Sequence, residues 1–313
     1  MIHDIMTGCQ GSSMKLVQNP HDLLQTKYSL FHNRFDTEHG VLWTIARQDA
    51  VPCVTHEFLH ELNENQRAIA DSRGKLLVGE EYHDIRFSVL TSITPGVFSL
   101  GGQLSLFRGL IRSQDRDALL KYAVACIDVI FPRTRHYELP LVTISLLQGD
   151  ALGGGLEGAL ASDIIIAERN CQLGFPEILF NLFPGMGAYS LIARKVSPKF
   201  AEKMILGGKM YSAEELHELG LVDVLAEDGK GVEAVNEYIK KQERRSNGYL
   251  AVQKARHRFN PLNYQELIDI TTVWVDAALQ LNEKDLKVMD RFVRSQEKLF
   301  LQPQVQTHIS KTA

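Results

Sequence analysis

The sequence feature that most constrains the fold is an apolar run that leads directly into a glycine-rich turn. Residues 140–146 contain no charged side chain and are typical of a buried strand. Residues 149–161 follow, with three consecutive glycines from Gly153 and then a helix of small residues. Residues 163–167 form a second short apolar run. Short buried strands that alternate with helices across glycine-rich turns predict an α/β core.

Hydrophobic periodicity divides the rest of the chain into further strands and helices, with a mostly helical tail from residue 201 onward. The expected elements are strands over residues 41–45 and 89–92, and helices after the candidate N-cap Thr55, over residues 113–130 and over residues 264–294. We therefore expect an irregular segment over residues 1–25, a core over residues 26–230 and a C-terminal helical region over residues 231–313.

Composition and charge exclude several classes of protein. The chain has 313 residues, of which 44% are hydrophobic and 23% are charged, and this balance indicates a folded globular protein rather than a disordered one. The net charge of -4 carries no overall signature of a nucleic-acid-binding protein. Charged or strongly polar residues interrupt every long apolar stretch, so we expect no membrane span.

The four cysteines are too scattered for a zinc motif or a disulfide framework. They are Cys9, Cys53, Cys126 and Cys171. Histidines such as His56, His60 and His136 show no metal-ligand spacing. The N-terminus lacks the basic start and unbroken apolar core of a signal peptide. We therefore expect reduced thiols, a cytoplasmic protein, and no metal or other cofactor.

The glycine run and the glutamate behind it are the first candidates for an active site. Glycines at a helix start let a ligand approach the backbone, and the unpaired N–H groups there face negative charge favourably. Neither a dinucleotide fingerprint nor a P-loop is present. Taken alone, the glycines are explained better by tight packing of helix against strand.

Two glutamates could supply acid–base chemistry. Glu157 lies in the first turn of the small-residue helix, where a buried carboxylate is costly unless it is paired or functional. Burial would raise its pKa into the range that suits general acid–base catalysis, and the alternative is an acid stabilised by the helix dipole. Glu177 follows Pro176 and by itself is typical of a surface or capping acid. The two form an acid–base pair only if the fold brings them together.

Five segments, in order along the chain, resemble successive signatures of the crotonase (enoyl-CoA hydratase/isomerase) superfamily. They are residues 98–104, 149–161, 175–177, 184–187 and 220–223. Residues 179–190 and 274–281 further resemble the branch that makes diffusible signal factors, the RpfF-type synthases of cis-2-unsaturated fatty acid quorum signals. This second likeness includes the helical tail, which generic hydratases do not share in this form.

The resemblance implies a crotonase-like α/β spiral of repeated ββα units with a C-terminal helical region, assembled as a homotrimer or a dimer of trimers. It implies that Glu157 and Glu177 are catalytic: one removes a proton from C2 and the other protonates the leaving 3-hydroxyl. It also implies that the backbone N–H groups of Gly102 and Gly154 form an oxyanion hole for the thioester oxygen. One departure is Gln103, where the family often has an aspartate; glutamine keeps hydrogen-bonding capacity but loses the charge.

The function implied is a quorum-signal synthase. It would dehydrate a 3-hydroxyacyl chain on acyl carrier protein and then hydrolyse the thioester, with a possible sensor kinase as a second partner. No serine or cysteine nucleophile motif offers a covalent route, so water is the expected nucleophile. Two alternatives stay open: an enoyl-CoA hydratase/isomerase of fatty-acid metabolism, and a catalytically idle acyl-thioester-binding protein.

Two further features carry weaker expectations. Seven basic residues between Lys240 and Arg258 offer a docking surface for an acidic carrier protein, although a solvated helix face is the commoner explanation. Trp274, Leu281 and Met289 form an apolar stripe. The family resemblance makes this stripe a candidate lining for an acyl tunnel, whereas helical spacing alone favours core packing.

Overall fold

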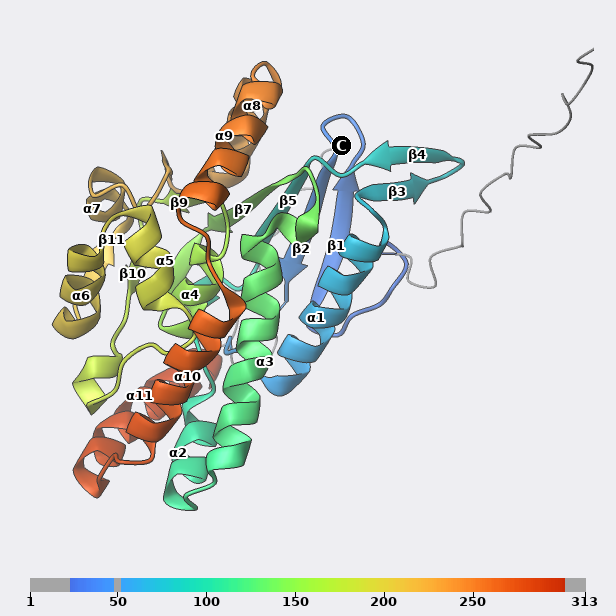
Figure 1. Ribbon diagram of the computed structural model, residues 1–313. Helices are drawn as coiled ribbons and strands as arrows, with labels where there is room; N and C mark the ends of the chain where they lie inside the picture. Colours follow the sequence, from blue (N-terminus) through green and yellow to red (C-terminus); the bar gives the residue numbers. More distant parts are fainter. Residues whose placement is uncertain (1–22, 48–51, 302–313) are drawn as a thin grey trace, which may run out of the picture.

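The computed structural model describes residues 23–47 and 52–301 (Figure 1), so most of the segment expected to be irregular, and Cys9, lie outside the described residues. The strands are β1 Phe31–Asp36, β2 Val41–Ala46, β3 Lys75–Val78, β4 Glu81–Asp84, β5 Phe87–Ser92, β6 Gly96–Ser99, β7 Val142–Leu147, β8 Gly149–Leu152, β9 Ile164–Glu168, β10 Gln172–Gly174, β11 Met210–Ser212 and β12 Val224–Ala226.

Helices surround these strands, and two short 3₁₀ helices are labelled η. The helices are α1 His56–Asp71, α2 Leu104–Arg112, α3 Arg116–Thr134, η1 His136–Glu138, α4 Gly154–Leu160, η2 Glu177–Phe180, α5 Ala188–Lys195, α6 Pro198–Gly207, α7 Ala213–Glu218, α8 Gly231–Glu243, α9 Ser246–Phe259, α10 Tyr264–Ala278 and α11 Glu283–Leu301. In Figure 1, α10 lies along α3, and the α8–α9 hairpin projects from the top of the molecule.

The strands form a spiral of repeated units. The larger sheet has the order β1-β2-β5-β7-β9-β12, and the smaller one has the order β11-β10-β8-β6. β5, β7 and β9 lead into β6, β8 and β10, so each turn of the chain adds one strand to each sheet before a helix follows. The pairings from β2 to β12 in the larger sheet are parallel. The expected crotonase-like α/β fold with a C-terminal helical region is confirmed.

The continuous apolar pattern of the central strands explains why they lie between two layers of helices. All six residues of β7 are buried, as expected for a parallel strand covered on both faces. One face packs into the main core, which includes Leu119 and Ile127 of α3. The other face packs against Val235 and Ile239 of α8. The sheet is therefore fixed between two layers of helices, and its strand ends are held in place.

Helix boundaries follow capping residues more closely than periodicity. Thr55 caps α1 as expected, because its side chain accepts a hydrogen bond from the N–H of Phe58 at 3.1 Å. The helix expected from residue 113 begins instead at Arg116, since Asp115 accepts from the N–H of Ala118 at 3.0 Å. The segment expected as one helical stretch, residues 264–294, is divided into α10 and α11 by a turn after Ala278.

Within residues 23–47 and 52–301, no helix combines the length and the apolar character needed to cross a membrane. Cys53, Cys126 and Cys171 are buried and free of disulfide bonds.

Candidate active site

A mainly apolar cavity lies between the larger sheet and the helices α1, α3, α4 and α10. It encloses about 1370 Å³ when the solvent at its mouth is included. Gly102, Gly154, Glu157, Glu177 and Trp274, all predicted from the sequence, line this one cavity. The fold therefore brings together candidates that are widely separated in the chain.

Glu157 is held in the cavity wall by a loop that follows it in the sequence. The residue is 1% exposed, and its Oε1 accepts hydrogen bonds from the N–H groups of Met186 at 2.8 Å and Ala188 at 3.0 Å. Burial raises the pKa of Glu157 to about 7, although these two N–H groups favour the ionised form. Glu157 thus changes its charge near neutral pH.

Glu177 begins η2 and extends its carboxylate over the glycine run. A Cβ built on Gly153 would lie 2.3 Å from Glu177 Oε1, and Gly153 has φ of +52°, so two constraints require glycine there. Glu177 Oε2 is buried without a hydrogen-bond partner in the described structure. Burial, followed by the charge of Glu157, raises the pKa of Glu177 to about 8. The two carboxyl groups therefore hold one proton between them over a narrow range of pH.

The backbone of Gly102 lies beside that of Gly154. A Cβ built on Gly154 would be 3.4 Å from the Gly102 nitrogen and 3.7 Å from Glu157 Oε2. Among the described residues, no backbone acceptor is recorded for the N–H of Gly102 or Gly154. Two free N–H groups beside two carboxyl groups can bind a carbonyl oxygen while protons move at neighbouring carbons.

Trp274 supports this arrangement from α10. A Cβ built on Gly185 would lie only 2.2 Å from Trp274 Cγ, so the indole packs directly on the loop that carries the N–H of Met186. Thr271 donates to the carbonyl of Gly185 at 2.9 Å. The loop was visible in the sequence as residues 184–187, but its role in holding Glu157 was not.

The structure does not bring Leu281 and Met289 to the cavity. Both are buried, at 8% and 0% exposure, and pack within the main hydrophobic core. Neither is among the residues that line the cavity. The helical spacing that favoured core packing explains these two positions, and Trp274 alone of the three contributes to the lining.

Sequence reasoning missed Gln296 of α11. Its Nε2 donates to the carbonyls of Leu100 at 3.1 Å and Gly102 at 3.3 Å, so the C-terminal helix braces the loop that carries the Gly102 N–H. Gln103 is the N-cap residue of α2 and makes no capping hydrogen bond with its side chain. An aspartate at this position would be a better cap for α2.

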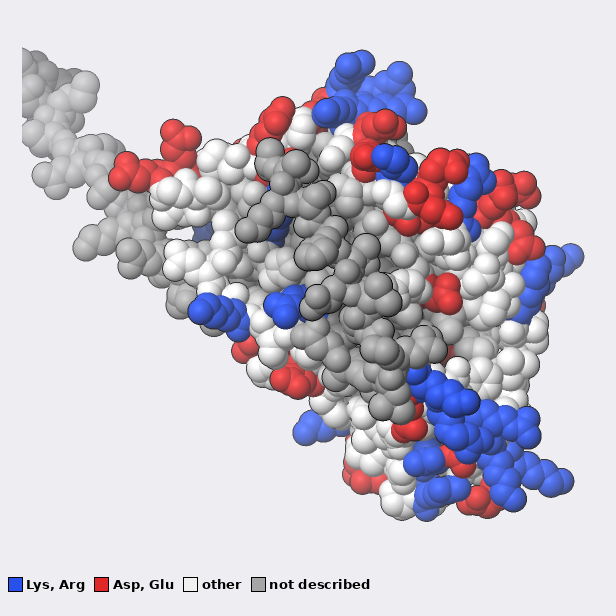
Figure 2. Space-filling view, turned by 180° about the vertical axis from the view of Figure 1, so that it is seen from behind, with Lys and Arg blue, Asp and Glu red and all other residues white. Residues whose placement is uncertain are grey.

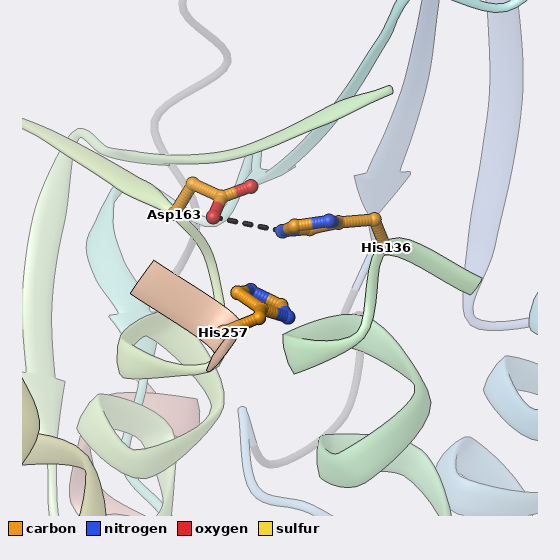
Figure 3. Close-up of side chains that lie close together, drawn as sticks. All are labelled: His136, Asp163 and His257. Atoms are coloured by element: carbon orange, nitrogen blue, oxygen red, sulfur yellow. Dashed lines mark hydrogen bonds and ion pairs between the residues drawn. The ribbon is translucent and has the colours of Figure 1, made fainter. Parts of the chain in front are cut away.

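A second polar cluster joins α9 to the core, outside the cavity. Figure 3 shows Asp163 hydrogen-bonded to His136, with His257 of α9 beside them; the Oδ1–Nε2 distance is 2.8 Å. These three side chains lie close enough to hold a metal ion. However, Arg256 donates to the same carboxylate oxygen at 2.8 Å, and Lys195 donates to the Asp163 carbonyl at 3.0 Å. Two cations already occupy this neighbourhood, so the cluster fits an anchor for α9 better than a metal site.

Comparisons with known proteins show the family to which the chain belongs. The family model for enoyl-CoA hydratase/isomerase matches residues 44–297. A probable mitochondrial enoyl-CoA hydratase 2 of Arabidopsis thaliana is 31% identical over 173 residues, or 55% of this chain. The matched segment spans 54% of that relative, about half of its length.

Solved structures share the fold at low sequence identity. An enoyl-CoA hydratase from Bacillus halodurans is 22% identical, with a TM-score of 0.69 over 84% of this chain and 100% of that one. DspI from Pseudomonas aeruginosa is 24% identical, with a TM-score of 0.59 over 74% of this chain and 89% of that one. The family model covers most of the sequence and the spiral fold agrees with it, so the chain belongs to the enoyl-CoA hydratase/isomerase family, within the crotonase superfamily.

Proposed function

We propose that this protein moves protons at C2 and C3 of an acyl thioester, interconverting 3-hydroxyacyl and 2-enoyl forms. The observation that carries this proposal is the pair of buried carboxyl groups, Glu157 and Glu177, beside the free N–H groups of Gly102 and Gly154. The N–H pair would bind the thioester oxygen as an enolate forms, which lowers the barrier to loss of the C2 proton.

Each carboxyl group serves one of the two carbon centres. In dehydration, one carboxylate accepts the C2 proton and the other carboxylic acid gives a proton to the departing 3-hydroxyl, so water leaves and a double bond forms. Hydration is the reverse sequence. Both directions need a pair that holds one proton in total, and the raised pKa values of Glu157 and Glu177 supply that state near neutral pH.

The pH dependence of kcat/KM tests this pairing. We expect a bell-shaped profile with its maximum between about pH 7 and 8, the pKa values of Glu157 and Glu177. Below this range the pair gains a second proton and no base is left; above it both groups are ionised and no acid is left. Initial rates across pH, with thermal melting at each pH to exclude unfolding, measure the profile. A flat profile from pH 5 to 9 would contradict the pairing.

For the substrate, we propose a 3-hydroxyacyl chain on acyl carrier protein that is released as a free cis-2-enoic acid. The likeness of residues 179–190 and 274–281 to the signal synthases supports this branch, and both segments lie at the cavity: Met186 and Trp274 line it. Hydrolysis can use the same Gly102 and Gly154 N–H groups, because attack of water on the thioester also places negative charge on the carbonyl oxygen.

A stripe of positive charge on α11 also supports a carrier protein. Lys and Arg side chains gather over the α8–α9 hairpin and, separately, over α11 and α2 (Figure 2). On α11 the exposed cations recur every three or four residues, so they share one face about 21 Å long. They are Lys284, Lys287, Arg291, Arg294 and Lys298.

The helix that carries the α11 stripe contacts the active site, whereas the basic run between Lys240 and Arg258, predicted from the sequence, lies on α8 and α9. None of its five cations forms an ion pair within the described structure, and the opposite face of the same helix carries Gln296, which braces Gly102. In the predicted run, Arg256 is bonded to Asp163 instead. We therefore propose α11, rather than the α8–α9 hairpin, as the docking face for an acidic carrier.

A side-by-side assay separates the two substrate candidates. We expect a medium-chain 3-hydroxyacyl carrier protein to yield free cis-2-enoic acid, and the matching CoA thioester to react much more slowly. Added salt should weaken the carrier reaction more, since exposed charges are screened beyond about 8 Å at physiological ionic strength. Lys287→Glu with Arg291→Glu should raise KM for the carrier by roughly tenfold or more. Lys240→Glu with Lys241→Glu, on α8, is the matched control and should change it little.

The second candidate is an enoyl-CoA hydratase, favoured by the match to the plant relative of that description. Rapid reversible hydration of trans-2-enoyl-CoA, with no free acid from the carrier substrate, would replace the synthase proposal with this one. Tight acyl binding without any turnover would favour a binding protein instead. Trimeric assembly and restraint by a sensor kinase stay predictions of the family resemblance.

A further inference from the structure

The cavity changes from apolar to polar along its length. Two helices line it side by side, and each presents apolar residues first and polar residues nearer its C-terminal end. The lining residues are Phe58, Leu59, Leu62, Asn65 and Gln66 on α1, and Tyr122, Cys126, Val129, Ile130 and Arg133 on α3. The spacing of each set matches one face of a helix.

The apolar lining extends over a distance comparable with the length of a medium-length acyl chain. A Cβ built on Gly102 would lie 3.6 Å from the Tyr122 hydroxyl oxygen, so Tyr122 marks the catalytic end. Arg133 lies eleven residues further along α3, about 16 Å away at the rise of an α-helix. An extended chain advances about 1.2 Å per bond, so roughly a dozen bonds span this distance.

Arg133 is a buried cation at the far end, with 5% exposure. Its guanidinium donates to Ser162 Oγ at 2.9 Å, Tyr137 Oη at 2.9 Å and the carbonyl of Ile144 at 2.8 Å. No carboxylate of the described structure forms an ion pair with it. Arg133 therefore holds the Tyr137 hydroxyl through its oxygen, and the hydroxyl proton stays available for another acceptor.

The backbone around Tyr137 is held in an unfavourable conformation. His136, Tyr137 and Glu138 have φ of +54°, +56° and +58°, the left-handed region that non-glycine residues seldom adopt. Such a run persists only where surrounding contacts determine it. The Arg133 hydrogen bond and the burial of Tyr137, at 5% exposure, are contacts of this kind.

Gln66 completes the polar end with an unsatisfied group. It is 4% exposed and lines the cavity, and its Oε1 has no hydrogen-bond partner in the described structure. The side-chain oxygen of the neighbouring Asn65 does have a partner, because it accepts a hydrogen bond from Asn33 Nδ2 at 2.7 Å. Gln66 Oε1, an acceptor without a partner, and the Tyr137 hydroxyl, whose proton has no acceptor among the described residues, thus line the same end of the cavity.

We propose that Gln66, Tyr137 and Arg133 form a polar stop that limits the length of the acyl chain. This inference rests on the proposed function, because it assigns the acyl chain to this cavity. An apolar terminus that reaches the stop faces polar groups and offers them no hydrogen bond, which is unfavourable. A shorter chain does not reach these polar groups. A chain that ends in a hydroxyl group can donate to Gln66 Oε1 and accept from Tyr137.

The test compares Gln66→Leu with the parent protein across 3-hydroxyacyl thioesters that differ by two carbons. We expect Gln66→Leu to raise kcat/KM for the first chain length that the parent rejects by about tenfold, relative to the preferred length. Gln253→Leu is the matched control: Gln253 is also 4% exposed with an unpartnered amide nitrogen, but it lies on α9 outside the cavity. It should leave the length profile unchanged.

A terminal hydroxyl on the rejected chain should restore much of the parent's activity and should not help Gln66→Leu. Unchanged length profiles in Gln66→Leu, or an equal change in Gln253→Leu, would overturn the stop. Thermal shifts with free fatty acids of graded length measure binding without turnover, and the same length dependence is expected there. If no thioester reacts but the binding profile shifts with Gln66→Leu, the proposed function fails and the stop stands.

Discussion

Glu157→Gln and Glu177→Gln are each expected to lower kcat by roughly 10²–10⁴-fold, the usual contribution of a positioned acid or base. Glutamine has the shape of glutamate but neither takes nor gives a proton at the reacting carbons. At position 157 its carbonyl oxygen can still accept from the N–H groups of Met186 and Ala188, so the loop should keep its place. The loss is therefore expected in the chemical step rather than in folding.

Thermal melting distinguishes a loss of catalysis from a loss of folded stability in these two variants. Burial raises the pKa of both carboxyl groups from the ordinary 4.5, so the folded state favours their protonated forms. The folded state therefore loses stability as pH rises from about 4.5 to about 7 to 8. A neutral amide avoids that loss, and each variant should melt at or above the parent temperature above pH 8. Glu168→Gln is the control variant and should keep the turnover of the parent. Glu168 is also buried, at 3% exposure, and accepts a hydrogen bond from the N–H of Gly231, but it lies outside the cavity. Near-normal turnover by either active-site variant would remove that glutamate from the acid–base pair.

Gly154→Pro is expected to lower kcat by about 10²–10³-fold, because proline has no N–H and one oxyanion donor disappears. Gly154 is the first residue of α4, the position where helices accept proline best. A Cβ there would approach the Gly102 nitrogen no closer than 3.4 Å. The fold should therefore survive the substitution, and circular dichroism checks this.

Gly154→Ala distinguishes the loss of the N–H donor from the steric effect of an added Cβ. Alanine adds the same Cβ but keeps the N–H, so its activity should stay close to that of the parent. Equal losses in the alanine and proline variants would mean that the added carbon, rather than the missing donor, blocks the reaction. A folded proline variant with normal turnover would exclude the Gly154 N–H from the oxyanion hole.

Much of the fold was predictable because its signals are local. The strands β2, β5, β7 and β9 each contain an apolar run that was recognised from the sequence, and Thr55 was recognised as a cap. The α2 helix, Leu104–Arg112, was missed, and the start of α3 was placed three residues early. The boundary between α2 and α3 depends on the side chain of Asp115, which caps the start of α3.

The candidate residues could be named from the sequence, but the burial and contacts that set their chemical state could not. Hydrophobic periodicity and the family-like motifs are properties of neighbouring residues, so Glu157, Glu177, Gly102 and Gly154 were named from the chain alone. A pKa depends instead on which atoms surround a carboxyl group after folding. The burial of Glu157, its bonds to the loop that Trp274 covers, and the bracing of Gly102 by α11 all join segments far apart in the chain. The same reason explains why Gln66 and Arg133 gave no signal: a buried polar side chain is recognisable only when its unsatisfied surroundings are known.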